Sequence, residues 1–247
     1  MLDSPARENE IKAVLGRKPA LRAWYAEMYE HYAEVLPRCP SEGVALEIGS
    51  GAGFARERLS ELTTSDVIAY AGVDRVIDAH RLPFSEGALR FIGMINVFHH
   101  IPDVEAFLRE AERCLRPGGR VLIIDQHPGL IAAPIFKHGH HEDFDAQAPA
   151  WRFESSGPLS GANGALAWIV FQRDREKFEA LFPHLQVVRY QTHSPLRYWL
   201  AGGLKSWSLL PGWAFGAATV LDRALLQVSP QFGSFSVIEL ERHTGGS

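Results

Sequence analysis

The chain has 247 residues, of which 46% are apolar and 22% are charged, and its formal net charge at pH 7 is −4. This composition is typical of a globular protein with a sizeable core, and it excludes disordered, collagenous and coiled-coil chains. The slight negative charge gives no basic surface for nucleic acid, so we expect a small-molecule substrate and no nucleic-acid partner.

The ends of the chain and its cysteines carry no signal for export. The first 18 residues lack the apolar stretch of a signal peptide, and the longest uncharged run near the C-terminus, residues 206–221, contains Pro211 and is short for a bilayer span. Cys39 and Cys114 lie far apart and outside any metal-binding spacing. We therefore expect a cytoplasmic protein with two reduced thiols.

The first predicted elements are a helix, a strand and a glycine turn. Apolar residues at helical spacing begin at Leu21 and continue until Pro37, which ends the helix. The apolar run over residues 44–48 predicts a buried strand, the glycine-rich segment 49–53 predicts a turn, and residues 54–62 predict a second helix.

The following elements alternate between apolar strands and amphipathic helices. A strand over residues 91–97 precedes a helix that Asp103 caps and that the Pro-Gly-Gly segment 117–119 closes. The remaining predicted elements are a strand over 121–124, a helix over 173–183, and strands over 185–190 and 235–240. Because the strands are almost continuously apolar, we predict a mostly parallel sheet covered by helices on both faces, the doubly wound α/β class.

Two segments interrupt this alternation. Residues 127–172 contain a His-rich patch, and residues 194–231 are rich in Leu, Trp, Gly and Ala. Loops this long in a compact domain usually carry function, so we expect both to form a substrate lid. We therefore predict a single domain over residues 1–247, with a helical lead-in over residues 1–42 and two lid insertions.

The glycine turn indicates a ligand site at the end of the first strand. Such a turn lets a ligand approach the backbone closely, and a following helix offers free N–H groups. A dinucleotide site requires G-x-G-x-x-G/A, and Phe54 stands where that pattern needs its last small residue. This mismatch disfavours an NAD(P)-dependent oxidoreductase, which remains an alternative.

Four motifs in order resemble the class I S-adenosylmethionine (SAM)-dependent methyltransferases. They are ALEIGSGAG at 45–53, DAHRLPF at 78–84, INVFHHI at 95–101 and FLREAERCLRPGGRVLI at 107–123. They are most similar to the small-molecule enzymes that include those of ubiquinone and menaquinone biosynthesis. The resemblance implies a Rossmann-like sheet of seven strands with the final strand antiparallel in an edge hairpin. It also implies SAM as cofactor and methyl transfer to an acceptor, and the apolar composition of the lid favours an acceptor that is small and partly hydrophobic.

The resemblance also assigns residues to the cofactor. It places the glycine turn against the methionine and ribose, Glu47 near the amino group, Asn96 beside the methionine, and Asp78 and Ala79 at the adenine. The full set of expected cofactor-binding residues is Glu47, Gly49, Ser50, Gly51, Gly53, Asp66, Asp78, Ala79 and Asn96.

We prefer Asp66 over Asp74 as the acid that ends strand two and binds the ribose diol. Asp74 lies four residues before Asp78, which leaves no room for an intervening strand, whereas twelve residues separate Asp66 from Asp78. A crossover between neighbouring parallel strands takes a dozen or more residues, usually as a helix. We therefore predict that the second crossover helix is missing or reduced to a loop.

His99 is the first candidate catalytic residue. His99 or His100 can act as a base at the carboxyl end of the fourth strand, where ligands bind in such sheets. Alternatively, one of these imidazoles packs against or caps the helix at Asp103. A base is needed only when the acceptor must lose a proton, and His127 is a further candidate for that role.

His141 and Glu142 are the other candidate catalytic residues. They belong to the patch 138–145, whose imidazoles and carboxylates can bind a metal ion, contact the substrate or face the solvent. Because no helical pattern pairs two of these side chains at i and i+4, we expect no metal.

Several roles stay open for the aromatic residues. Trp199, Trp207, Trp213 and Phe215 suit an apolar substrate pocket, a transient membrane-interface contact or ordinary core filling. Tyr29 either packs against the sheet or closes over the cofactor. A SAM-binding regulatory or assembly subunit without catalytic activity is a second alternative function, and the acceptor and oligomeric state stay undetermined.

Overall fold

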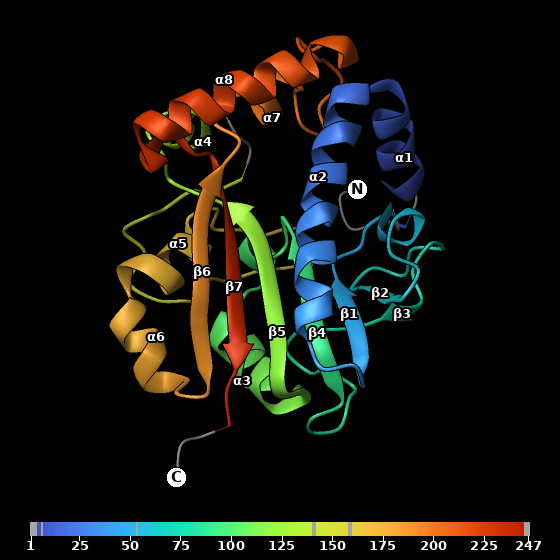
Figure 1. Cartoon of the computed structure of the whole chain (residues 1–247), viewed down its shortest axis with the longest axis vertical. Coiled ribbons are helices and arrows are strands. Elements are labelled where there is room, and N and C mark those ends of the chain that lie inside the picture. The colour runs from blue at the N-terminus through green and yellow to red at the C-terminus, as the bar shows by residue number, and fades with distance from the viewer. Residues whose placement is uncertain (1–3, 6, 53, 140–141, 158–159, 245–247) are drawn as a thin grey trace.

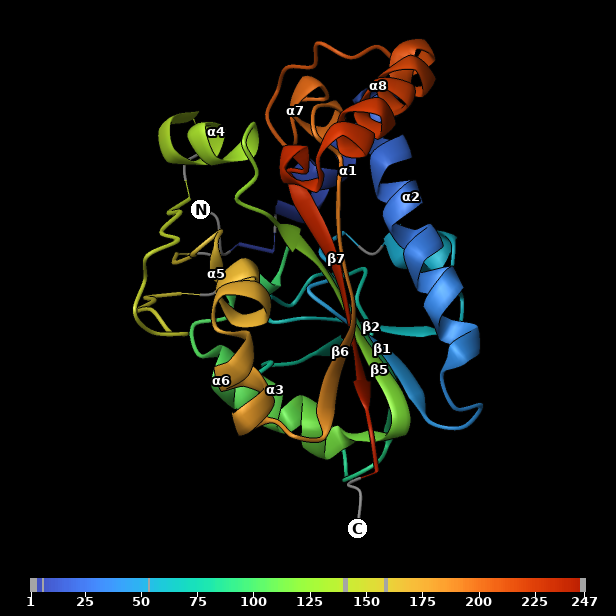
Figure 2. The ribbon, with the colours of Figure 1, turned by 60° about the vertical axis from the view of Figure 1, so that its left-hand side comes forward.

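A computed structural model describes residues 4–5, 7–52, 54–139, 142–157 and 160–244, leaving aside the side chains of residues 138 and 139. A sheet of seven strands runs through its centre, with helices on both faces (Figures 1 and 2). The predicted doubly wound α/β class is therefore confirmed. The strands are β1 (Val44–Ile48), β2 (Leu62–Asp66), β3 (Arg75–Val76), β4 (Leu89–Ile95), β5 (Leu115–Gln126), β6 (Leu185–His193) and β7 (Phe235–Arg242).

The strand order is β3-β2-β1-β4-β5-β7-β6. Strands β1 to β5 pair in parallel, whereas β7 runs antiparallel to both β5 and β6. This confirms the antiparallel pair expected at the end of the sheet. The chain leaves β1 in one direction toward β2 and returns to its other side as β4, so the crevice between the carboxyl ends of β1 and β4 is the place where ligands bind in such sheets.

The central strands β1, β4, β5 and β7 are mostly buried, and helices cover both faces of the sheet. Figure 2 shows α3, α5 and α6 on one face of the sheet and α2 on the other, while α4, α7 and α8 lie at the end where β5 finishes. The helices are α1 (Arg7–Arg17), α2 (Pro19–Val35), α3 (Val104–Cys114), α4 (Ala132–Gly139), α5 (Leu166–Trp168), α6 (Arg175–Leu181), α7 (Arg197–Leu200) and α8 (Phe215–Val228).

Two helices form as their sequence patterns predict. Helix α2 buries Trp24 against the end of β7, where its ring lies 5.2 Å from that of Phe235 and its Nε1–H donates to Ser194 Oγ at 2.8 Å. Helix α3 begins at Asp103, whose carboxylate accepts the Ala106 N–H at 3.0 Å and so satisfies one of the unpaired donors of the first turn.

The helix expected over residues 54–62 is wrong. The structure has a single 3₁₀ turn there, Phe54–Glu57, and β2 begins at Leu62. The glycine turn uses the first part of the connection, and the eight residues that remain would rise only about 12 Å as an α-helix. That length is too short to return along a five-residue strand of about 17 Å and leave room for the turns.

The connection between β2 and β3 contains no helix, as predicted. Residues 67–74 form bends and turns, and β3 is only two residues long. Asp66 ends β2, while Asp74 immediately precedes β3.

The first predicted insertion divides into two parts. Helix α4 lies at the carboxyl end of the sheet, but residues 165–171 are almost wholly buried, as α5 and the π-helical turn Ile169–Arg173, in the core that α3 also joins. This second part packs as a crossover element between β5 and β6. The second insertion forms α7 and α8 above the sheet (Figure 1). Within the described residues, no helix is both long enough and apolar enough to cross a bilayer.

Candidate cofactor and acceptor site

A cavity of about 910 Å³ opens at the carboxyl ends of β1 and β4. Its walls come from the glycine turn, the ends of β2 and β4, the N-terminal helices, α4 and the segment around α7. The expected site residues that line it are Glu47, Gly49, Ser50, Gly51, Asp66, Asp78, Ala79, Asn96, His99 and Glu142. Gly53 and His141 lie outside the described residues.

The glycine turn is shaped by two backbone positions that favour glycine. Gly49 has a φ of +74°, and a Cβ there would lie 2.2 Å from Val97 Cγ2 at the end of β4. Gly51 has a φ of +53°, and a Cβ there would meet nothing within 4 Å because the turn faces open space. Ser50 fastens the turn to β2 by donating its N–H to Ser65 O at 2.8 Å. The turn therefore presents its backbone to the cavity.

Asp66 and Asp74 have different surroundings. Asp66 is buried at the cavity wall, where its Oδ2 accepts the Gly51 N–H at 2.9 Å. The Asp74 carboxylate accepts the N–H and hydroxyl of Thr64, both at 2.9 Å, and pairs with Arg56, and it is not among the residues that line the cavity. The structure thus brings Asp66 to the site and uses Asp74 to join β2 to the segment before β3.

Two buried acceptor oxygens face the cavity without a partner among the described residues. They are Glu47 Oε2 and Asn96 Oδ1, at the ends of β1 and β4. Burial raises the pKa of Glu47 to about 7, because the charged carboxylate loses its hydration. Asn96 adopts a φ of +56°, a left-handed conformation that Asn tolerates better than most residues. A buried carboxylate with one oxygen left without a hydrogen bond favours a ligand that brings positive charge.

Asp78 and Ala79 form a more open wall of the cavity. The Asp78 side chain is 60% exposed, and its Oδ1 accepts the backbone N–H of His80 at 2.9 Å and lies 2.7 Å from its ring Nδ1. His80 Nε2 in turn accepts the N–H of Asp103 at 3.3 Å. The contact expected between Asp103 and His99 or His100 is therefore made by His80 instead.

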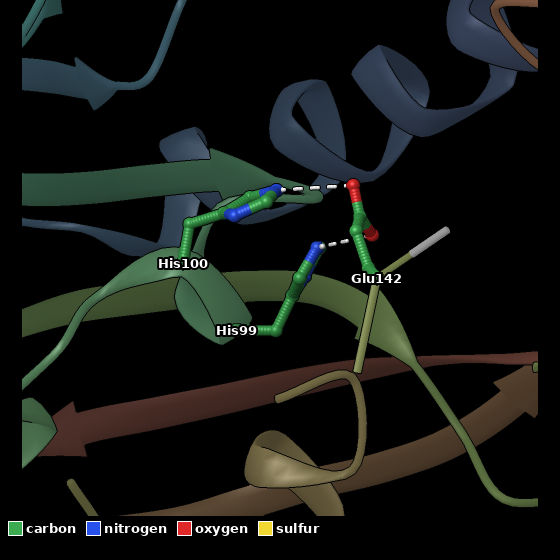
Figure 3. A group of neighbouring side chains, drawn as sticks. All are labelled: His99, His100 and Glu142. Carbon is green, nitrogen blue, oxygen red and sulfur yellow. Dashed lines mark ion pairs between the residues drawn. The ribbon is translucent and has the colours of Figure 1, made fainter. Parts of the chain in front are cut away.

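His99, His100 and Glu142 meet in the same cavity, and Figure 3 shows both imidazoles directed toward the carboxylate. His99 Nε2 lies 3.4 Å from Glu142 Oε2, and His100 Nε2 lies 3.5 Å from Glu142 Oε1. Behind His99, the buried Asp125 places its Oδ1 2.6 Å from His99 Nδ1. Three separate segments thus supply one polar cluster.

The charges of this cluster reinforce one another. Burial alone lowers the pKa of His99, but the charge and hydrogen bond of Asp125, together with those of Glu142, raise that pKa to about 10. Burial alone raises the pKa of Glu142, but its hydrogen bonds to His100 and His99 and their charges hold that pKa well below its usual range. Without another cation present, His99 is therefore an imidazolium between two carboxylates.

His127 does not share this site. It lines a separate cavity of about 410 Å³, where its Nδ1 lies 2.9 Å from the Tyr190 hydroxyl. Burial lowers the pKa of His127 to about 4. The expectation that His127 could serve as the base is therefore wrong for the conformation described here.

Aromatic side chains form part of the cavity wall. Trp199, Trp207 and Tyr29 line it, whereas Trp213 does not and is 89% exposed. Phe215 is partly buried and packs under Arg197. Other residues of this wall carry no functional signal in the sequence, among them Gln126, Phe136, Tyr198 and Phe235.

Comparison with known proteins agrees with this architecture. Residues 21–182 match a family model described as a methyltransferase domain. Over 80 residues the chain is 31% identical to the ubiquinone/menaquinone biosynthesis C-methyltransferase UbiE of Desulfotalea psychrophila, a match that covers 32% of each protein. Over 69 residues it is 35% identical to the 2-methyl-6-phytyl-1,4-hydroquinone methyltransferase of Synechocystis, covering 28% of this chain and 21% of that one. The matched part spans about a third or less of these relatives.

A solved structure shows the same fold over nearly the whole chain. It is a chain of the complex between the Trm112 methyltransferase activator of Haloferax volcanii and a methyltransferase. The superposition has a TM-score of 0.53 at 13% sequence identity and covers 97% of both chains. Because the family model covers well over half of the residues and the fold agrees with it, the chain belongs to the methyltransferase domain family.

Proposed function

We propose that the protein is a SAM-dependent methyltransferase that acts on a small, partly hydrophobic acceptor. The observation that carries this proposal is one continuous cavity with two chemically different ends. One end has the glycine turn with two buried acidic residues, and the other has the imidazole–carboxylate cluster under an aromatic wall.

The residues at the first end fit SAM. The cofactor carries an ammonium and a sulfonium, and the unpaired oxygens of Glu47 and Asn96 are acceptors suited to this positive charge. Asp66 is placed to bind the ribose hydroxyls, while Asp78 and Ala79 provide the wall for the adenine. Glu47, Gly49, Ser50, Gly51, Asp66, Asp78, Ala79 and Asn96 are the residues we assign to cofactor binding, with Gly53 assigned from the motif alone.

The residues at the second end fit an acceptor. When bound, SAM supplies a methyl group on a sulfonium and departs as a neutral thioether. The chain then has to hold the acceptor in line with that methyl group and keep water out, which is what an enclosed aromatic wall provides. Glu142 is placed to accept a hydrogen bond from an acceptor hydroxyl and so orient it, and the His99 imidazolium is placed to stabilise negative charge that develops on that oxygen.

Two segments act as the substrate lid in this proposal. Ile135 and Phe136 of α4 and the residues around α7 line the cavity from above the sheet. The buried segment 165–171 takes no part in the lid, because it packs in the core.

We also propose that the lid touches a lipid surface transiently. Exposed apolar side chains gather on α8 and the loop before it, and the half-exposed Trp207 both lines the cavity and adjoins this loop. Trp213 is the residue type that favours a membrane–water interface. The residues of this lipid-facing patch are Leu209, Trp213, Val220, Leu221 and Val228.

Flotation with phospholipid vesicles tests this contact. We expect the unmodified protein to float with vesicles and the double variant Trp213→Ser, Val220→Ser to stay behind. Val188→Ser removes an exposed apolar side chain from β6 and should float like the unmodified protein. Equal flotation of all three proteins, or flotation of none, would contradict the membrane contact.

Ligand-induced thermal stabilisation tests the main proposal. SAM and S-adenosylhomocysteine should raise the unfolding midpoint, whereas NAD⁺ and NADP⁺ should not. Transfer of labelled methyl to a panel of quinol, phenol and prenyl acceptors then separates an enzyme from a regulatory SAM-binding subunit. Stabilisation by NAD(P)⁺ alone refutes the proposal, and cofactor binding without turnover on any acceptor favours the subunit.

A further inference from the structure

The distances in the cluster of His99, His100 and Glu142 are longer than those of charge-assisted hydrogen bonds and match the separation of two ligand atoms on one metal ion. Charge-assisted N–H···O hydrogen bonds are about 2.7–2.9 Å long, whereas the two imidazole Nε2 atoms lie 3.4 Å and 3.5 Å from the Glu142 oxygens. Ligand atoms on a tetrahedral zinc ion, with bonds of about 2.0–2.1 Å, are separated by about 3.3–3.4 Å. One donor atom from each of the three residues can be chosen so that all lie within 4.8 Å of one another.

Both imidazoles are oriented from behind. His99 Nδ1 lies 2.6 Å from the Asp125 carboxylate, and His100 Nδ1 lies 3.2 Å from the backbone oxygen of Gly161. With a proton on each Nδ1, the Nε2 lone pairs of both rings point toward Glu142. Histidines that bind metals in proteins are held in this way, by a carboxylate or a backbone carbonyl on the second nitrogen.

Asp125 is itself fixed. It is fully buried at the end of β5, where its Oδ1 accepts the N–H of Gln126 at 2.7 Å and its Oδ2 accepts the N–H of His99 at 3.2 Å. The support behind His99 is therefore built from the sheet, whereas the support behind His100 comes from Gly161 of the first insertion.

We propose that His99, His100 and Glu142 form a binding site for a divalent transition-metal ion of the zinc class. Two nitrogens and one carboxylate favour zinc and its neighbours over magnesium or calcium, which prefer oxygen ligands alone. All three residues line the large cavity, so a fourth coordination position would face the space where the acceptor lies. Three protein ligands and one open position are typical of catalytic rather than structural zinc sites.

A local sequence pattern could not reveal this site. Its two histidines are adjacent in the turn after β4, and its carboxylate comes from the segment after α4. The sequence analysis considered a metal only within residues 138–145, and of that patch the proposed site uses Glu142 alone.

The proposed metal site is argued from this geometry alone, whereas a role of the metal ion in methyl transfer rests on the proposed function. An acceptor hydroxyl on the open position would have its pKa lowered by the ion, which makes the oxygen a better nucleophile toward the methyl group. The proton leaves to solvent, because Glu142 is itself a ligand of the ion, and no redox step is involved.

Cobalt binding to the full chain tests the site. After treatment with a chelator, the protein is titrated with Co²⁺ and followed by the visible absorption that four-coordinate cobalt gives, and Zn²⁺ is then added to displace it. We expect one equivalent to bind. Because supporting partners alone change metal affinity by about 10–100-fold, loss of a ligand in Glu142→Gln or His100→Gln should weaken it by more than about 100-fold, and Asp125→Asn by about 10–100-fold.

His184→Gln is the matched control. His184 is an exposed imidazole just before β6, at the end of the sheet away from the cavity, and its variant should bind Co²⁺ like the unmodified protein. Thermal stabilisation by S-adenosylhomocysteine is measured for every variant, because a retained response shows that the fold and the cofactor end are intact.

Two results would overturn the site. One is that the unmodified protein binds Co²⁺ no more tightly than folded Glu142→Gln, in which case the cluster is only an imidazolium between carboxylates. The other is that His184→Gln loses binding as strongly as His100→Gln. Failure of S-adenosylhomocysteine to bind while Co²⁺ binding persists would refute the proposed function and leave the metal site standing.

Discussion

Replacing Glu47 by Gln tests the electrostatics of the cofactor end most directly. In the absence of ligand, burial raises the pKa of this carboxyl from 4.5 to about 7. The folded chain therefore retains the proton up to about pH 7, whereas the unfolded chain loses it near pH 4.5. The contribution of Glu47 to the free energy of unfolding is thus fully present below pH 4.5 and is lost as the pH rises through 7. The total loss is about 3 kcal/mol, at about 1.36 kcal/mol per pKa unit.

A cationic cofactor should act in the opposite direction. SAM favours the charged form of Glu47, so binding expels the proton and the affinity for SAM should rise by up to about tenfold per pH unit below pH 7. Glu47→Gln has no proton to lose. We expect it to unfold with a flatter pH dependence and to bind SAM more weakly at pH 7.5, with no linked proton.

The assays are denaturant unfolding between pH 4.5 and 8 and calorimetric titration with SAM over pH 5–7.5 in buffers of different ionisation enthalpy. Glu30→Gln removes an exposed acid that pairs with Arg58, and this control should keep both slopes. The reasoning is refuted when Glu47→Gln shows the same pH slope as the unmodified protein in unfolding and in SAM binding.

Three further predictions concern individual residues. Asp66→Ala should weaken SAM binding far more than Asp74→Ala in calorimetry, and the reverse order would overturn the assignment of the ribose acid. Gly49→Ala should abolish SAM binding and lower the unfolding midpoint, because its methyl meets the valine at the end of β4, whereas Gly51→Ala should cost only the strain of its backbone, about 1–3 kcal/mol. Phe171→Ala should lower the free energy of unfolding by about 3–5 kcal/mol in denaturant titrations, as for other buried aromatic residues. A decrease of less than about 1 kcal/mol would place this segment in the lid instead of the core.

The cofactor end could be predicted because its residues follow one another along the chain. Glu47 and the glycine turn belong to one strand and the loop that leaves it, so a local motif identifies them together. Asp66 was preferred by counting residues, and the absence of a helix before β3 followed from the same count. The helix after the glycine turn was mispredicted because the pattern of residues 54–62 is helical locally, while the length of the connection allows only one turn.

The acceptor end could not be predicted in the same way. His99 and Asp125 meet because β4 and β5 are neighbours in the sheet, and Glu142 joins them from a segment that no strand or helix pattern places. Nothing in the local sequence of Asp125 distinguishes an acid that supports an imidazole from one that ends a strand. Contacts of this kind depend on the tertiary structure alone.

The packing of Trp24 has a consequence for the order in which the protein can mature during synthesis. The pocket of Trp24 on α2 is completed by Ser194 and Phe235, so this side chain lacks these two partners until the ribosome has added about 200 further residues. At about 5–20 residues per second this takes about 10–40 s. During that interval the indole of Trp24 lacks its final cover, whereas Tyr32 of the same helix can already pack against Phe91 of β4.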